Sequence, residues 1–145
     1  MTMTHTILQG DVRSQLATIP ENTVRCCVTS PPYFGLRDYG MDEQIGLERD
    51  PDAFVDTLVG VFREVRRVLT TDGTLWVNIG DSYAGSGKGP EGNIGKGETH
   101  RNVGSTHGGI IPDGMKPKDL IGIPWMLAFA LRKDGWYLRQ DIIWH

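Results

Sequence analysis

The stretch that decides the fold is Val24-Arg25-Cys26-Cys27-Val28-Thr29-Ser30-Pro31-Pro32-Tyr33. Its first half, Val24 to Val28, is an apolar run that predicts a buried β-strand. Pro31 and Pro32 then lack a backbone N–H and fix φ at about −65°, so the chain must turn rigidly there. A hydroxyl group and an aromatic ring are thereby held at the carboxyl end of a strand. Open α/β sheets bind their ligands at such strand ends.

The spacing of apolar residues predicts three further strands and three helices around this stretch. In chain order they are a strand over 6–9, a helix over 12–19 with Asp11 as its N-cap, a helix over 51–69 with Asp50 as its N-cap, a strand over 74–79 after Asp72-Gly73, a largely buried helix that begins near Pro124 and ends at Asp134-Gly135, and a strand over 136–144. Strands that alternate with helices favour a parallel sheet and an α/β fold.

Length and composition limit the class of protein. A chain of 145 residues, of which 39% are hydrophobic, allows one modest core and is too short for two ordinary domains. No run approaches the roughly 18 apolar residues of a membrane span, and residues 1–5 lack the pattern of a signal peptide. We therefore expect one domain, or part of one, in the cytoplasm and without a membrane partner.

Charge is spread unevenly along the chain. Residues 1–81 carry 7 basic and 12 acidic side chains, whereas residues 82–145 carry 8 basic and 6 acidic ones. Proteins that bind nucleic acid gather Lys and Arg on one face, so any surface for DNA is expected in the second half or outside this chain. The arginines at 63, 66 and 67 suit the end of a helix and are expected to form a solvated face.

Neither the cysteines nor the glycines indicate a cofactor site. Cys26 and Cys27 are adjacent on a predicted strand, point to opposite faces and are expected to be small buried hydrophobes rather than a redox pair or a metal site. Residues 84–115 hold ten glycines and predict a long flexible loop. Its Gly-Lys pairs lack the second glycine and the following Ser or Thr of a phosphate-binding loop.

The segment Ser30-Pro31-Pro32-Tyr33 resembles the catalytic motif of the amino-group DNA methyltransferases, which move a methyl group from S-adenosylmethionine to the exocyclic amine of cytosine or adenine. Four other segments are similar to that family in the right order: Gly10-Asp11, residues 34–40, residues 76–83 and residues 135–144. The order of motifs looks like the beta-type group. The resemblance implies a Rossmann-like methyltransferase fold, a mainly parallel sheet with helices on both faces, that is incomplete in this chain.

The resemblance also implies roles for individual residues. The catalytic set is Ser30, Pro31, Pro32 and Tyr33, and the target-base pocket would contain Asp11, Asn78, Asp81 and Trp144. Ser30 Oγ and the Pro31 carbonyl are acceptors for the N–H groups of the target amine, and Tyr33 offers a face on which a flipped base can stack. Asp11 as a helix cap is the alternative, and both roles can coexist. The basic residues of the glycine-rich loop and its end, Lys88, Lys96, Arg101 and Lys116, are candidate DNA contacts, although a disordered linker is favoured there.

Two regions of the family are missing from the sequence: the target-recognition region and the Phe-x-Gly-x-Gly loop that binds the cofactor. We therefore expect residues 1–145 to be a truncated N-terminal catalytic portion, to need the C-terminal half of the methylase as its partner, and to bind S-adenosylmethionine weakly alone. No residue is assigned to the cofactor. The partner would be double-stranded DNA with a flipped base.

The target base is predicted from the first motif position. In the family, serine there is more typical of cytosine N4 enzymes, and Asp or Asn of adenine N6 enzymes, so a cytosine N4 methyltransferase of a restriction-modification system is favoured. The alternatives are an adenine N6 enzyme, an inactive truncated α/β fragment with residual DNA binding, and a methyltransferase for RNA or a protein amide.

Overall fold

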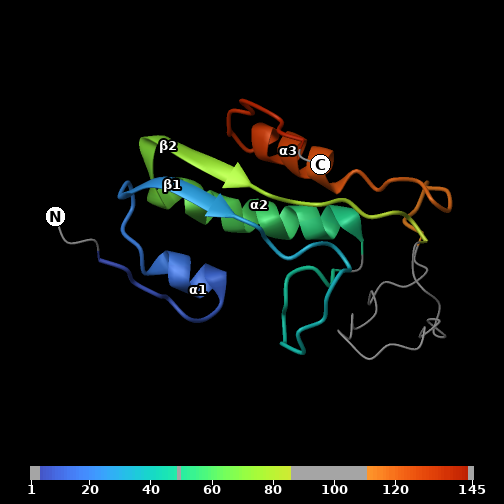
Figure 1. Ribbon diagram of the computed structural model, residues 1–145, viewed down its shortest axis with the longest axis horizontal. Coiled ribbons are helices and arrows are strands. Elements are labelled where there is room, and N and C mark those ends of the chain that lie inside the picture. Colours follow the sequence, from blue (N-terminus) through green and yellow to red (C-terminus); the bar gives the residue numbers. More distant parts are fainter. Residues whose placement is uncertain (1–3, 49, 86–110, 144–145) are drawn as a thin grey trace.

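Two parallel strands joined by a long helix form the centre of the molecule (Figure 1). The computed structural model of the protein describes residues 4–48, 50–85 and 111–143. Its elements follow in the order α1 (Val12–Ala17), β1 (Val24–Thr29), α2 (Pro51–Val68), β2 (Leu69–Val77) and α3 (Ile123–Lys133). β1 and β2 pair in parallel, with α2 as the crossover between them. The predicted α/β class with a parallel sheet is confirmed.

The helix α2 supplies more of the core than any other described element. The Asp50 carboxylate accepts a hydrogen bond from the Ala53 backbone N–H at 2.8 Å, and Pro51 opens the first turn, as the sequence predicts. Phe54, Leu58 and Phe62 follow at intervals of four residues and are at most 2% exposed, because that spacing places them on one face of the helix. Ile123 of α3 completes the fully buried centre.

The two faces of the β1–β2 pair differ in burial. Cys27, Leu75 and Val77 pack against the core, whereas Val28 is 78% and Trp76 50% exposed on the opposite face. Cys26 belongs to that open face and is exposed, so the prediction that both cysteines are buried is wrong for Cys26. Alternation along a strand places neighbours on opposite faces, and the described residues cover only one of them.

The second strand begins earlier than the sequence predicts. α2 ends at Val68 and β2 starts at Leu69, whereas the sequence suggested a helical stop at Asp72-Gly73. Val24 pairs with Leu69 but Cys26 pairs with Thr74, so the register shifts between them. Asp72-Gly73 therefore lies in an irregular excursion within the strand, where a side chain at Gly73 would lie 2.9 Å from the Thr70 carbonyl oxygen.

Two predicted strands are absent from the described residues. Residues 4–9 and 136–143 have no strand assignment, and Ile7 and Tyr137 are 93% and 88% exposed. A strand needs a neighbour to pair its backbone N–H and C=O groups, and the sheet described here consists of β1 and β2 alone. Apolar alternation in these segments therefore indicates the potential to pair rather than a paired strand. None of the described helices is long and apolar enough to cross a membrane.

The helix α3 is half-exposed. Ile123, Leu127 and Leu131 are buried, whereas Trp125 and Phe129 are each 51% exposed. The prediction of a largely buried helix is therefore wrong: only the stripe that faces α2 is covered.

Arginines of α2 connect it to its neighbours, although Arg63 and Arg66 stay exposed to solvent as the sequence predicts. Arg63 pairs with the Asp134 carboxylate at 2.6 Å, and Arg66 donates to the Asp134 carbonyl, so both hold the end of α3. Arg67 donates to the Leu16 carbonyl at 2.9 Å and to the Ile19 carbonyl at 3.1 Å, at the end of α1. These contacts orient α1 and α3 on α2.

The Arg63–Asp134 contact gives the first testable prediction. The hydrogen bond from Arg63 lowers the pKa of Asp134 below its usual value. A lowered pKa in the folded state means a stabilising contribution that is present above the ordinary pKa of about 3.9 and is lost as the pH falls. Asp134→Asn should therefore reduce stability near neutral pH and flatten the loss of stability between about pH 5 and pH 3, measured by urea unfolding across that range. In an Arg63→Ala, Arg66→Ala background the same substitution should have little effect, and an equal effect in both backgrounds would contradict the assignment.

Candidate functional site

The predicted motif lies where two strands end side by side. Thr29 is the last residue of β1, and its carbonyl accepts the Asn78 backbone N–H at 2.9 Å, one residue beyond the end of β2. Ser30 and Asn78 therefore follow adjacent parallel strands at the same edge of the sheet. Both residues are exposed there. The structure thus brings these two predicted site residues together.

The turn that follows Ser30 is fixed at its far end by the core. Phe34 is 6% exposed, and its ring packs against Phe54 of α2 with the ring centroids 5.5 Å apart. Pro31 and Tyr33 are half-buried and Pro32 is exposed. The sheet holds Thr29 and the core holds Phe34. The four motif residues between them are therefore fixed at both ends.

Two glycines approach the motif closely. A Cβ atom at Gly80 would lie 2.8 Å from Tyr33 Cε2, and one at Gly46 would lie 3.0 Å from the Tyr33 carbonyl oxygen and 3.3 Å from Pro32 Cβ. Gly46 also has φ of 103°, which favours glycine, and its carbonyl accepts the Gly35 backbone N–H at 2.8 Å. The loop after the motif therefore folds back against the Pro32–Tyr33 backbone.

Asp81 caps the start of helix α3, although it lies far from that helix in the sequence. Its carboxylate accepts the backbone N–H groups of Gly122 at 2.9 Å and Ile123 at 3.1 Å, and that of its neighbour Ser82 at 2.8 Å. Gly122, the N-cap of α3, has no side chain to satisfy the free N–H groups of the first turn. Asp81 therefore joins the end of β2 to the start of α3 and uses most of its acceptor capacity in doing so.

Asp11 is the N-cap of α1. Its carboxylate accepts the Arg13 backbone N–H at 2.9 Å and pairs with the Arg13 guanidinium at 3.0 Å. The hydrogen bond from Arg13 lowers the pKa of Asp11, so the side chain stays ionised at neutral pH. The helix-cap role is confirmed, and a place in the target-base pocket stays a prediction.

The ends of the predicted glycine-rich loop lie next to the site. Tyr83 forms an antiparallel bridge with Leu120, the Ala84 N–H donates to the Asp119 carbonyl at 2.8 Å, and the Ile121 N–H donates to the Ser82 carbonyl at 2.9 Å. Residues 119–121 thus lie beside residues 82–84, which follow β2. Lys116, shortly before residues 119–121, is exposed. The remaining predicted DNA contacts, Lys88, Lys96 and Arg101, and the predicted pocket residue Trp144 lie outside the described residues.

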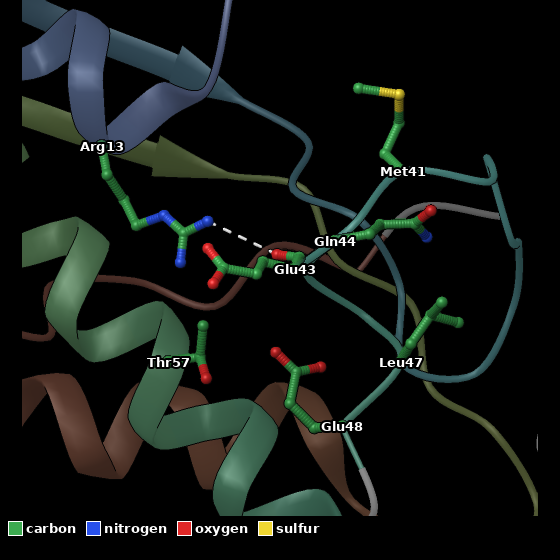
Figure 2. A pocket seen from close by; sticks show the side chains of 7 residues that line it. All are labelled: Arg13, Met41, Glu43, Gln44, Leu47, Glu48 and Thr57. Carbon is green, nitrogen blue, oxygen red and sulfur yellow. Dashed lines mark hydrogen bonds between the residues drawn. The ribbon is translucent and has the colours of Figure 1, made fainter.

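A shallow hollow of about 370 Å³ opens between α1, α2 and the loop over residues 41–48 (Figure 2). Arg13 reaches across it from α1 and donates to the Glu43 carbonyl at 3.4 Å, while the Glu48 side chain lies on the other side near Thr57. None of the motif residues from Ser30 to Tyr33 lines this hollow, so we do not place the target base in it.

Sequence reasoning missed the contacts of Gly46, Phe34 and Gly80, and the capping role of Asp81. A signal for the last was present: Gly122-Ile123-Pro124 starts a helix without a capping side chain of its own, so an acceptor had to come from elsewhere. The glycine contacts have no comparable signal, because they depend on which residues of the motif pack against each glycine in space.

Comparisons with known proteins identify the family to which this fold belongs. Residues 24–145 match a family described as DNA methylase. Curated relatives include the type II methyltransferases M.Cfr9I of Citrobacter freundii, 54% identical over 97% of this chain, and M.XycI of Xanthomonas campestris pv. cyanopsidis, 52% identical over 97% of this chain. The chain spans about half the length of these relatives, 46% of each.

A solved structure also has this fold. TTHA0409 of Thermus thermophilus, assigned as a DNA modification methylase and crystallised with S-adenosyl-L-methionine, superposes with a TM-score of 0.52 at 28% identity. The match covers 87% of this chain and 39% of that protein. The fold of the described residues is therefore similar to that of one part of this larger solved methylase.

The role of Asp81 gives the second prediction. Asp81→Ala removes the acceptor for the first N–H groups of α3 and should lower the free energy of unfolding by about 1–3 kcal/mol. Amide hydrogen exchange should speed up at Gly122 and Ile123 before it does in α2. Asp81→Asn keeps one acceptor oxygen and should give a smaller loss, and Asp113→Ala, which removes an exposed carboxylate, serves as the control. Unchanged exchange in α3 would contradict the capping role.

Proposed function

Because the chain belongs to the DNA methylase family, we propose that it carries the target-amine site of an enzyme that transfers a methyl group from S-adenosylmethionine to N4 of cytosine in DNA. The observation that supports this most is the position of Ser30, which is exposed at the end of β1 beside the end of β2. Tyr33, three residues later, is packed against Gly46 and Gly80. Because the chain spans 46% of each of the two curated relatives, the proposal concerns the activity of a methylase that includes these residues.

The chemistry requires acceptors at this place. The lone pair of an exocyclic amine is delocalised into the base, so the nitrogen is a poor nucleophile until its N–H groups are held away from the ring plane. Ser30 Oγ and the Pro31 carbonyl supply two acceptors on adjacent residues of a rigid turn. S-adenosylmethionine, when bound, supplies the electrophilic methyl group. Ser30 and Pro31 contribute by orientation and electrostatics, without a covalent step.

The other proposed residues divide into two groups. Tyr33 provides a face for the flipped base, and Asn78 presents an exposed side chain at the adjacent strand end. Asp81 contributes by holding α3 and the end of β2 together, and Asp11 and Trp144 stay assigned to the pocket by resemblance. Lys116, with Lys88, Lys96 and Arg101, is proposed to contact DNA phosphates, in agreement with the positive charge of residues 82–145.

Cytosine N4 is proposed because serine occupies the first motif position. An adenine N6 enzyme is the alternative, and both share the same acceptor geometry at Ser30 and Pro31. An inactive fragment with residual DNA binding is the second alternative, since the chain spans only part of its relatives.

The third prediction tests Ser30 itself. In the active methylase that contains this chain, Ser30→Ala removes one acceptor of the target amine and should lower kcat by about 10²–10³-fold, the usual cost of one oriented polar group in an active site. The affinity for S-adenosylmethionine, measured by calorimetry, should change less than about twofold, which is well under the contribution of one hydrogen bond. Ser14→Ala, an exposed position on α1, is the matched control. Unchanged turnover in Ser30→Ala would remove Ser30 from the mechanism.

The fourth prediction concerns the product. DNA methylated by the active enzyme, digested to nucleosides and separated by mass spectrometry, should contain N4-methylcytosine and lack enzyme-dependent N6-methyladenine. N6-methyladenine in its place would support the adenine alternative. Absence of both from an enzyme that binds DNA and cofactor would support the inactive-fragment alternative.

A further inference from the structure

Gly80 lies against the ring that is proposed to stack on the target base. A Cβ atom built on Gly80 would lie 2.8 Å from Cε2, 3.3 Å from Cδ2 and 3.6 Å from Cζ of Tyr33. Carbon atoms that are not bonded pack at about 3.5–4.0 Å, so a methyl group at position 80 cannot coexist with the ring in its present place. Either the backbone at Gly80 or the ring of Tyr33 would have to move.

The backbone at Gly80 is held on both sides. Two residues earlier, the Asn78 N–H donates to the Thr29 carbonyl at 2.9 Å and continues the parallel pairing of the sheet. One residue later, the Asp81 carboxylate is fixed by the N–H groups of Gly122 and Ile123 at the start of α3. Displacement of Gly80 would disturb the sheet edge or the helix cap, so the chain can hardly retreat from the ring.

The ring of Tyr33 is the part that can move, whereas the Tyr33 main chain is held in place. The Tyr33 carbonyl accepts the Leu36 N–H at 3.3 Å, and Gly46 also packs against that carbonyl. The Tyr33 main chain is thus positioned by its own loop, whereas rotation about the side-chain bonds remains open to the half-buried ring. A side chain at position 80 would therefore be accommodated by a different orientation of the ring.

We propose that Gly80 is a positioning residue for base stacking: by having no side chain, it lets the Tyr33 ring lie against the end of β2 in the orientation that receives the flipped target base. This inference rests on the proposed function, and it assigns to Gly80 a role through Tyr33 rather than a contact with the substrate. The backbone of Gly80 does not itself require glycine, because its φ is not in the left-handed region. The requirement for glycine at position 80 therefore comes from the close approach of the Tyr33 ring.

Gly80→Ala in the active methylase tests the proposal. A ring displaced by about 1 Å should lower kcat/KM by about 10–10²-fold, while binding of S-adenosylmethionine stays close to that of the wild type. With 2-aminopurine in place of the target base, the wild-type enzyme should quench the flipped base by stacking, and Gly80→Ala should raise its emission. A role in folding alone would not change that emission.

Two glycines elsewhere provide matched controls. Gly60→Ala places a methyl group in open space on α2, and Gly73→Ala places one 2.9 Å from the Thr70 carbonyl oxygen, away from the motif. Gly60→Ala should leave kcat/KM unchanged. Gly73→Ala should lower the melting temperature without raising the 2-aminopurine emission, which separates crowding in general from crowding of Tyr33.

The decisive measurement is a double-mutant cycle with Tyr33→Ala, which removes the ring. If Gly80 acts through Tyr33, Gly80→Ala should have no further effect on kcat/KM in the Tyr33→Ala background. Equal losses in both backgrounds, or an unchanged kcat/KM in Gly80→Ala alone, would overturn the proposal.

The Gly80→Ala variant can also be compared with the double variant by its folding. If Gly80→Ala alone fails to fold, recovery of folding in the double variant supports the contact, and failure of both variants overturns it. A wild-type enzyme that methylates no base would instead contradict the proposed function, whatever the emission of the variants shows.

Discussion

The hydrogen bond from the Asn78 N–H to the Thr29 carbonyl is the contact on which the arrangement of the site depends. It continues the parallel pairing of β1 and β2 to the last residue of each strand, so the segments that leave the sheet start side by side. Ser30 leaves one strand into a rigid turn, and Gly80 leaves the other toward α3. Parallel strands that are connected by a helix necessarily end at the same edge, so residues more than forty positions apart in the chain are brought together there.

The same edge is reinforced by groups whose first role is structural. Asp81 satisfies the amide groups at the start of α3, and the Arg63–Asp134 and Arg66–Asp134 contacts hold the other end of that helix on α2. Phe34 inserts behind the motif against Phe54. The Asp81 and Phe34 contacts join the loops at the strand ends to α3 and to the core, whereas the arginine contacts hold α3 itself on α2.

The sequence predicted the features that depend on neighbours along the chain. The Asp50-Pro51 start of α2, its apolar face and the strand that ends before Ser30 are local patterns, and all three are confirmed. The failures concern partners that lie far away in the chain. The strand over 6–9 and the strand over 136–144 need a neighbouring strand that no local pattern provides, and the burial of Cys26 was inferred without knowing which face α2 would cover. Asp81 was identified as important, but its partners lie 41 and 42 residues later and could be found only in space.

Within the part of the chain that the structure describes, the Ser30–Tyr33 turn is held by the sheet pairing at Thr29, the ring of Phe34 on Phe54, and the close approaches of Gly46 and Gly80. The described residues therefore organise the proposed amine-binding turn with their own core. Orientation of a weak nucleophile is effective only when the orienting groups are held before the substrate arrives, because groups that must be ordered during the reaction lose part of the advantage in entropy. A turn fixed between a sheet edge and a helix core meets that condition, so under the proposed function the target amine is oriented by the described residues and not by the groups that bind the cofactor.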